Sequence, residues 1–472
     1  MDILNTEFKR QFAVSFYKNL KIKLSEMTFL RDFASAKDGN MYPIVYKSAD
    51  CEEKTEYNRY KIKGGKVKRI IGSFFPYATY EMSASVESGK VGFSFIMPAS
   101  EASVAIDTDS LIYACGKSNI KVSLPEYCSG AVNLIVSCRP GAFDIYFKRN
   151  GKAEYFRSFD EDAFANSHQY SEFSVSKFAI FAEGNVEVQS IASYIDNGIS
   201  IADMRPIRYE NGDVMVENGH IYITASIRMQ SEKFQGVFSW IPGTSEFELT
   251  GALFYDSGDG MWCGDVAASV LYHRGEKRWY LWICSFSHGH ILGHSVFEGD
   301  IRFGVNVVDI KLMEKAGNDS KISDFMGFSG DEDPDFFYDE KNKRWLMTVC
   351  RIDRDTDKYR YVFFESDKPF DDYRFIGMGP IGDETGGTFV KIDGEIYFIC
   401  GNSFDLTSDY RIYHKGGMTN AKFDYPDGGF RGWGTLMPIK LGSRTRYFWL
   451  TFDRHAASDY TWSYGNLYCF EA

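Results

Sequence analysis

The sequence has no long apolar run and little proline. None of its stretches reaches the roughly 18 consecutive apolar residues of a membrane-spanning helix, and its first residues carry charges where a signal peptide would be apolar. Only 12 of 472 residues are proline, whereas 17% are aromatic, which excludes collagen-like and low-complexity polymers. We therefore expect a globular, soluble, cytoplasmic protein of about two or three domains.

Basic residues and cysteine motifs are also scarce. The 53 Lys and Arg are outnumbered by 65 Asp and Glu, and the net charge of −12 makes nucleic acid and anionic membranes unlikely partners. The nine cysteines are scattered, with no CxxC pair and no Cys/His ligand spacing. They are expected to be reduced core residues. We expect no metal and no cofactor, and the sequence leaves the oligomeric state open.

Residues 58–196 alternate between apolar and polar positions, as in VGFSFIMP (91–98), and Asn150-Gly151 marks a hairpin turn. This pattern predicts an antiparallel β-sandwich. We assign residues 1–200 to it as an accessory domain that holds no catalytic residue. The structure of residues 1–57 stays open, because Phe8, Phe12 and Phe16 suggest a helical stripe whereas LKIKLSEM (20–27) alternates like a strand.

Residues 201–472 repeat a strand-turn-strand unit five times, at intervals of about 50 to 65 residues that leave room for four strands each. The repetition predicts an all-β fold, with a five-bladed β-propeller over 201–472. Little chain follows the fifth unit, so the strand that closes the ring is expected from MRPIRYE (204–210). The five units are DVMVENGHIYITASI (213–227), DVAASVLYHRGEKRWYLWICSF (265–286), DPDFFYDEKNKRWLMTVCR (333–351), ETGGTFVKIDGEIYFICGN (384–402) and GTLMPIKLGSRTRYFWLTF (434–452).

Four of the five units begin with an acid, and Gly434 begins the fifth. Because the first strands of propeller blades line one channel and start at one face, these acids are expected to converge. Like charges in an apolar opening raise the pKa of at least one of them, and carboxyl groups with separated pKa values are what a glycosidase uses as acid and base. The four acids are Asp213, Asp265, Asp333 and Glu384.

Three of these segments resemble five-bladed glycosidases of glycoside hydrolase families 43, 32, 62 and 68, across about residues 205–472. They are DVMVENGHIYITAS, EDPDFFYDEKNKRWLM and ETGGTFVKIDGEIYFI. Residues 133–196 resemble concanavalin-like or laminin-G-like sandwiches. The resemblance implies hydrolysis of a small oligosaccharide, with Glu384 as general acid, Asp213 as base or nucleophile and Asp333 as the residue that tunes the acid. It favours inversion and needs no catalytic metal. Asp265 and Asp335 remain alternatives for one of the three positions.

Further residues are candidates for binding the sugar. Trp262 and Trp433 precede strands where a sugar ring could stack. The other candidates are Asp265, Arg351, His288 and His455. His288, His290 and His294 have no carboxylate at a fixed spacing, which argues against a metal site. Two other functions stay open: a retaining fructan hydrolase or fructosyltransferase of the family 32 or 68 kind, and a propeller that binds glycans without cleaving them.

Overall fold

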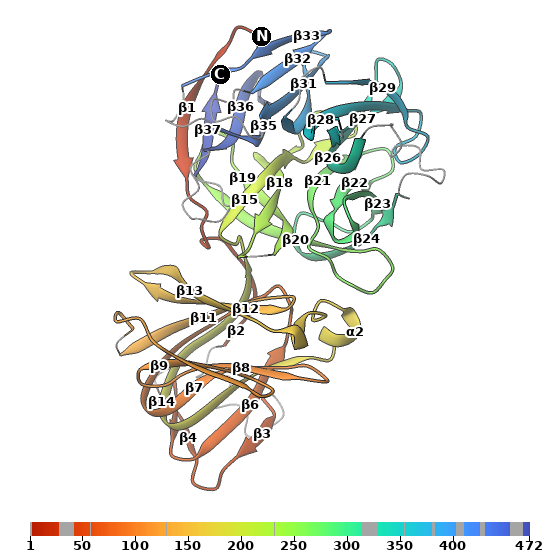
Figure 1. Ribbon diagram of the computed structural model, residues 1–472. Coiled ribbons are helices and arrows are strands. Elements are labelled where there is room, and N and C mark those ends of the chain that lie inside the picture. Colours follow the sequence, from red (N-terminus) through yellow and green to blue (C-terminus); the bar gives the residue numbers. More distant parts are fainter. Residues whose placement is uncertain are drawn as a thin grey trace. The chain divides into compact units, whose positions relative to one another are not determined.

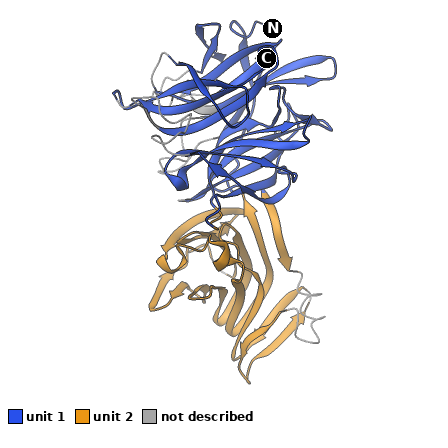
Figure 2. Ribbon diagram, turned by 90° about the vertical axis from the view of Figure 1, so that its right-hand side faces the viewer, with its two compact units in different colours: residues 1–20, 197–259, 263–472 blue, residues 21–196, 260–262 orange. Residues whose placement is uncertain are grey.

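The computed structural model describes residues 2–27, 42–56, 58–128, 130–230, 232–313, 328–353, 355–379, 383–402, 410–424, 430–453 and 466–472. The chain forms two compact units (Figure 2). Unit 1 comprises residues 1–20, 197–259 and 263–472, and unit 2 comprises residues 21–196 and 260–262. Residues 1–20, which the sequence analysis assigned to the sandwich, therefore belong to the other unit.

In the residues that the structure describes, unit 1 consists of five separate, mainly antiparallel sheets, the blades of a propeller (Figure 1). Blade 1 contains β15 (Ser200–Pro206), β18 (His220–Arg228), β19 (Lys233–Trp240) and β20 (Phe247–Asp256), with β17 (Val216–Glu217) and β24 (Gly304–Asp309) at its edges. Blade 2 contains β16 (Arg208–Tyr209), β21 (Val266–His273), β22 (Arg278–Ser285), β23 (Ile291–Phe297) and β25 (Lys311–Leu312), and the short helix η2 (Phe286–His288) follows β22.

The remaining blades follow in chain order. Blade 3 contains β26 (Phe328–Asp339), β27 (Arg344–Asp353), β28 (Lys358–Ser366) and β29 (Arg374–Met378). Blade 4 contains β30 (Glu384–Ile392), β31 (Glu395–Asn402), β32 (Arg411–His414) and β33 (Gly417–Asn420). Blade 5 contains β35 (Phe430–Leu441), β36 (Arg444–Asp453), β37 (Leu467–Glu471), β1 (Glu7–Val14) and β34 (Lys422–Phe423). The predicted five-bladed propeller is confirmed.

One strand of each blade faces the central channel. These innermost strands contact one another in a ring, β15 with β21, then β26, β30 and β35, which returns to β15. Each shifts register against its neighbour at a bulge. At the bulge, four of the five strands place a residue in the left-handed region, with φ between 50° and 63°. These residues are Asp203, Ala267, Asp333 and Gly386.

The ring is closed by the N-terminal strand. β1 pairs antiparallel with β37, from Lys9 opposite Glu471 to Val14 opposite Leu467. Phe8 is fully buried against Trp449, with ring centroids 5.2 Å apart. Pairing with β1 satisfies the backbone of β37, which would otherwise be an exposed edge.

The prediction that residues 204–210 close the ring is therefore wrong. Residues 200–206 form β15, the innermost strand of blade 1, and residues 208–209 form β16 in blade 2.

In its described residues, unit 2 is all-β apart from two short helical segments, η1 (Asp162–Phe164) and α2 (Tyr170–Phe173). Its strands form one hydrogen-bonded set of 13, in which the long strand β14 pairs with β2, β5, β6 and β7. One apolar core lies among them. Its division into the two sheets of a sandwich stays a prediction. The strands are β2 (Lys21–Met27), β3 (Ile44–Lys47), β4 (Glu52–Glu56), β5 (Arg59–Lys63), β6 (Lys66–Ser73), β7 (Thr79–Ile96), β8 (Glu101–Ile106), β9 (Ser110–Cys115), β10 (Ser118–Ser123), β11 (Ala131–Arg139), β12 (Ala142–Arg149), β13 (Lys152–Asp160) and β14 (Lys177–Asp196).

The cysteines carry no disulfide bond. All nine are free thiols; eight are buried and Cys128 is half-buried. In the part of the chain that the structure describes, no helix has the length and apolar character to cross a membrane.

Candidate functional site

A buried ion pair lies between the innermost strands of the propeller. Arg208 is the first residue of β16, which follows β15. Its guanidinium contacts the Asp335 carboxylate and donates to the Phe389 carbonyl at 2.9 Å. Asp335 also accepts hydrogen bonds from the Ser269 hydroxyl at 2.6 Å and the Phe389 N–H at 2.7 Å. Asp335 is therefore fully committed inside the channel, and its geometry is that of a structural residue.

Asp203 and Asp333 lie at equivalent bulges, in the innermost strands of blades 1 and 3. The Ser226 hydroxyl donates to Asp203 at 2.5 Å and also accepts from the Ala267 N–H at 3.2 Å, which fixes Asp203 to blades 1 and 2. Asp203 and Asp333 keep 6% and 5% of their surface exposed, whereas the Asp335 side chain has none. Asp331 and Asp339 on β26 are exposed to a similar extent, at 7% and 6%, so the pair is distinguished by its position at the bulges and not by exposure.

The surroundings of Asp333 raise the pKa of its carboxyl group. Burial, followed by the negative charge of Asp203, raises its pKa to about 7, and the Arg205 guanidinium opposes this shift. Its Oδ2 accepts hydrogen bonds from the Thr385 hydroxyl at 3.1 Å and the Gly386 N–H at 3.2 Å, both at the bulge of blade 4. A carboxyl group with a raised pKa beside a second carboxyl group is an arrangement used in general acid-base catalysis.

A second set of acids occurs two residues before the bulge residue in blades 2, 3 and 4. Each is buried and is bound by later strands or loops of its own blade rather than by the channel. Asp265 accepts from the Ser285 hydroxyl at 2.7 Å, and Asp331 pairs with Arg351. Glu384 is the third member of this set.

Glu384 has no exposed surface. Its Oε1 accepts from Arg411 at 3.0 Å and from the Tyr413 hydroxyl, both on β32. Burial raises its pKa, although these two hydrogen bonds act against the shift. Oε2 lies against Gly379, where an added Cβ would come within 2.8 Å of it. Glu384 is therefore enclosed between protein groups.

Asp213 is not brought together with Glu384. It follows β16 in an exposed turn, where Asn211 donates to it at 2.9 Å and Lys391 lies 3.5 Å away. Lys391 is near the end of β30 and Glu384 is its first residue, so the length of that strand separates the two acids. The prediction that Asp213 begins the innermost strand of blade 1 is wrong, because β15 holds that position.

The predicted sugar-binding residues are scattered. Trp262 belongs to unit 2, where its ring packs against Phe173 and Tyr170 at centroid distances of 4.7 and 5.4 Å. Arg351 is only 1% exposed and holds Asp331. The side chain of Trp433, in β35, and the whole of His455 lie outside the described residues. None of these observations places an aromatic sugar platform at the channel.

The three clustered histidines have different surroundings. His288 is part of a chain of hydrogen bonds that begins at Asp265, through Ser285 at 2.7 Å. The Nδ1 of His290 lies 2.9 Å from the Glu332 carboxylate, whereas burial lowers the pKa of His294 to about 4. In the described ranges, no group of three or more His, Cys, Asp or Glu could hold a metal ion.

Sequence reasoning missed Asp203, Arg205 and Arg208. Because Asn218-Gly219 is a clear hairpin turn, the first unit of the propeller was assigned to residues 213–227. The strand before that turn, β17, has only two residues. The signal that could have identified β15 is the apolar run before Asp203 together with the proline three residues after it. In blade 3, a proline likewise follows the aspartate of the innermost strand, at Asp333-Pro334.

Comparison of the sequence with models of known protein families and with curated proteins gives no match. The fold is similar to solved glycosidases, including families 62 and 43, which the sequence resemblance named. An α-L-arabinofuranosidase from Podospora anserina, solved with cellotriose, is 11% identical, with a TM-score of 0.40 over 58% of this chain and 91% of that one. A family 117 glycoside hydrolase from Zobellia galactanivorans is 10% identical, with a TM-score of 0.37 over 58% and 84%. These likenesses concern the fold alone.

Proposed function

We propose that the protein is a glycoside hydrolase whose reacting carboxyl groups are Asp203 and Asp333. The observation that carries the proposal is the pairing of these two acids at equivalent bulges, with Asp333 held near a pKa of about 7 by burial and by its partner. A protonated and an ionised carboxyl at one pH are what the cleavage of a glycosidic bond requires.

In the proposed reaction, Asp333 donates its proton to the glycosidic oxygen as the bond from the anomeric carbon to that oxygen breaks. Asp203, as the carboxylate, removes a proton from a water molecule whose oxygen bonds to the anomeric carbon. One proton is given and one is taken, so the pair exchanges its protonation states and resets through solvent. Ser226 orients Asp203, and Thr385 with the Gly386 N–H orients Asp333.

We further propose that the reaction inverts the anomeric configuration. The two acids come from blades 1 and 3, which blade 2 separates in the ring. A pair from non-neighbouring blades leaves room for the water that an inverting enzyme places between base and sugar, at a carboxyl separation of about 6.5 to 9.5 Å. Nuclear magnetic resonance of the first product distinguishes inversion from the retention expected of a family 32 or 68 enzyme.

Glu384 is proposed as a positioning residue rather than the general acid of the sequence-based assignment. Arg411 and Tyr413 fix its carboxyl group at the start of β30. The next two residues, Thr385 and Gly386, supply the hydrogen bonds to Asp333. Glu384 thereby holds the backbone that orients the acid.

The test is a screen of aryl glycosides and natural disaccharides and trisaccharides, followed by variants on any substrate that is cleaved. D203N and D333N should each lower kcat by at least about 10²-fold, the usual scale of a general acid or base. D213N is the matched control and should keep full activity, because it removes an acid of the same propeller far from the pair. Full activity in D203N or D333N would overturn the assignment.

A glycan-binding propeller without catalysis is the second candidate. The complete burial of Glu384 favours it, because the resemblance implied that this residue reaches the substrate. The same screen decides between the two functions. A saccharide that binds but is not cleaved, and that binds D203N more weakly, would support the binding function.

A further inference from the structure

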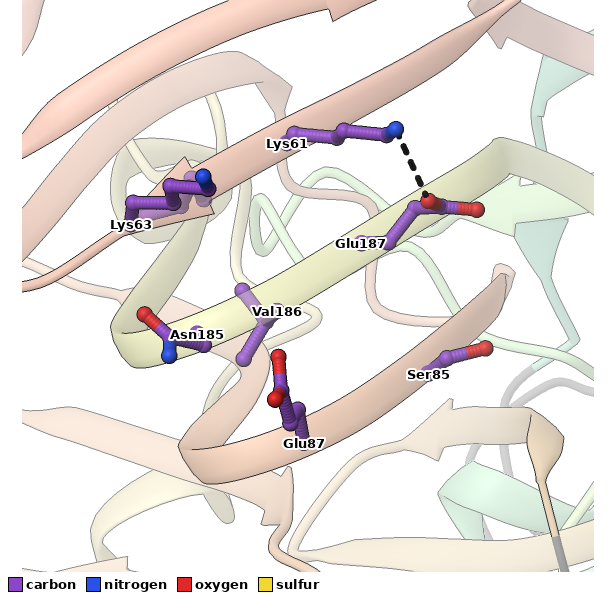
Figure 3. Close-up of a pocket in the computed structure, with 8 residues that line it drawn as sticks. Lys61, Lys63, Ser85, Glu87, Asn185, Val186 and Glu187 are labelled. Atoms are coloured by element: carbon purple, nitrogen blue, oxygen red, sulfur yellow. Dashed lines mark ion pairs between the residues drawn. The ribbon is translucent and has the colours of Figure 1, made fainter.

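Unit 2 contains a hollow on the outward side of three neighbouring strands (Figure 3). We call it the β5–β14 hollow. Its volume is about 300 Å³, at the small end of the range for ligand pockets. Its lining consists of Lys61, Ile62 and Lys63 from β5, Ser85 and Glu87 from β7, and Asn185, Val186 and Glu187 from β14.

The strand register arranges these side chains in two cross-strand rows. In the first, Glu187 of β14 lies opposite both Lys61 and Ser85. Beyond this row, two residues further along β5 and β14, lie Lys63 and Asn185, on the same side as Lys61 and Glu187. The register between β14 and β7 shifts here, so that Asn185 pairs with Ser88 and Glu87 lies at the bulge beside it; we call Lys63, Asn185 and Glu87 the second row. Between the rows lie Ile62 and Val186, which are almost fully buried and point into the core.

The first row is paired within the protein. Lys61 lies 3.7 Å from the Glu187 carboxylate, the contact drawn in Figure 3, and 2.9 Å from Glu56. Arg59 contacts Glu187 at 2.8 Å. These charges satisfy one another, so this row forms a fixed wall of the hollow.

The second row is available for a ligand. Within the described residues, the Lys63 ammonium and the Glu87 carboxylate form no ion pair or hydrogen bond. The Asn185 carbonyl oxygen accepts from the Gly64 N–H at 3.2 Å, which fixes the amide and leaves its NH₂ as a donor. Two donors and one acceptor therefore face one small space.

The charges identify the class of ligand. Two lysines and two glutamates line the hollow, and their formal charges cancel. A free anion would meet both carboxylates and a free cation both ammonium groups, whereas a neutral molecule meets no net charge. A hydroxyl group can donate to Glu87 and accept from Lys63 or Asn185 at the same time.

From this geometry we infer that the β5–β14 hollow is a binding site for a neutral saccharide, separate from the propeller acids. Among the described residues that line it there is no aromatic side chain, so the sugar is held by hydroxyl contacts without ring stacking. The inference stands on unit 2 alone and does not depend on catalysis in unit 1.

The experiment uses the full chain and a panel of probes: glucose, galactose, arabinose and cellotriose as neutral sugars, glucuronic acid as an anion and glucosamine as a cation. Calorimetry measures affinity, and hydrogen exchange of peptides locates the site. At least one neutral sugar should bind more tightly than both charged probes and slow exchange in residues 59–64, 84–88 and 183–188. Slowed exchange only in β15, β26 or β30 would locate binding at the propeller and overturn the inference.

Variants complete the test. K63M and E87Q should each weaken binding of that sugar at least tenfold, whereas K117M and D162N, which change exposed charges of unit 2 outside the hollow, should leave it unchanged. D333N should also leave binding of the sugar at the β5–β14 hollow unchanged. A failure of this inference is therefore distinguishable from a failure of the proposed catalysis. Binding that survives both K63M and E87Q, or no binding of any neutral probe at 20 mM, would overturn the inference.

Discussion

Asp203 and Asp333 share one backbone conformation, with φ of 50° at both residues. Few residues other than glycine adopt this left-handed conformation without cost, and aspartate is among those that do so most often. The same bulge carries Ala267 in blade 2 and Gly386 in blade 4. The left-handed bulge residue thus occurs in four blades, and in two of them it is an aspartate.

The proton affinity of Asp333 can be tuned through Glu332. The charge of Glu332 contributes to the raised pKa of Asp333, because it disfavours a second negative charge nearby. E332Q removes that charge, so the pKa of Asp333 falls and the alkaline limb of the activity profile moves to lower pH. The pH dependence of kcat measures the shift. E340Q, at the far end of β26, should leave the limb in place; an unchanged limb in E332Q would show that Asp333 does not set it.

Glu384 can be separated into its two possible roles by two substitutions. If it only positions β30, E384Q keeps an oxygen that accepts from Arg411 and Tyr413, and kcat should fall by less than about tenfold with the alkaline limb unchanged. E384A removes both contacts, and its kcat should fall much further than that of E384Q. A loss of about 10²-fold or more in E384Q, with folding intact, would restore the general-acid role predicted from the sequence.

The ion pair in the channel should dominate the stability of unit 1. R208M leaves the Asp335 carboxylate buried without its partner and should lower the free energy of unfolding by about 3–5 kcal/mol. R208M combined with D335L should recover part of that loss. R274M, which removes a partly exposed pair with Glu210, is the control and should cost less than about 1 kcal/mol. Denaturant unfolding gives all three values, and equal losses in R208M and R274M would contradict the argument.

Ring closure by β1 can be tested at one side chain. F8A removes a ring packed against Trp449 and Phe423 and should destabilise unit 1 by about 3–5 kcal/mol. F12A, on the same strand but only half-buried, should cost clearly less. Hydrogen exchange of β37 reports the effect, since its amides are protected by pairing with β1. Unaltered protection of β37 in F8A would show that β1 is dispensable for closure.

Trp262 should affect stability and not catalysis. Its ring packs against Phe173 and Phe75 in unit 2, so W262A should lower the thermal stability of that unit. The KM for any substrate should stay unchanged. A rise in KM with stability intact would restore Trp262 as the sugar platform that the sequence suggested.

The sequence predicted the five-bladed propeller correctly but misassigned the innermost strand of blade 1. Four of the five predicted units begin on innermost strands or one residue before them, and the second strand of every unit is the neighbour of an innermost strand. In blade 1 the innermost strand and its neighbour are separated by short strands and a turn, so local alternation marked the wrong acid. The apolar run and the proline around Asp203 are weak local signals, and the place of β15 in the ring is defined by its contacts with β21 and β35.

The choice between Asp333 and Glu384 also required the structure. Both begin an apolar strand and are followed by a turn and a second strand, so their sequence contexts are alike. One lies on the bulge and the other two residues before the equivalent bulge, which turns their side chains to different surroundings. A difference of two residues in register is visible only through the pairing of the strands.

The pairing of β1 with β37 sets an order of events during synthesis. β1 leaves the ribosome before the strands of the other blades and before its partner β37, so it stays unpaired until β37 has been synthesised. Unit 2, almost all of which is encoded between β1 and β15, can fold during that wait. Closure is then the latest step for the propeller, and folding of unit 1 should be slow in proportion to this separation in sequence.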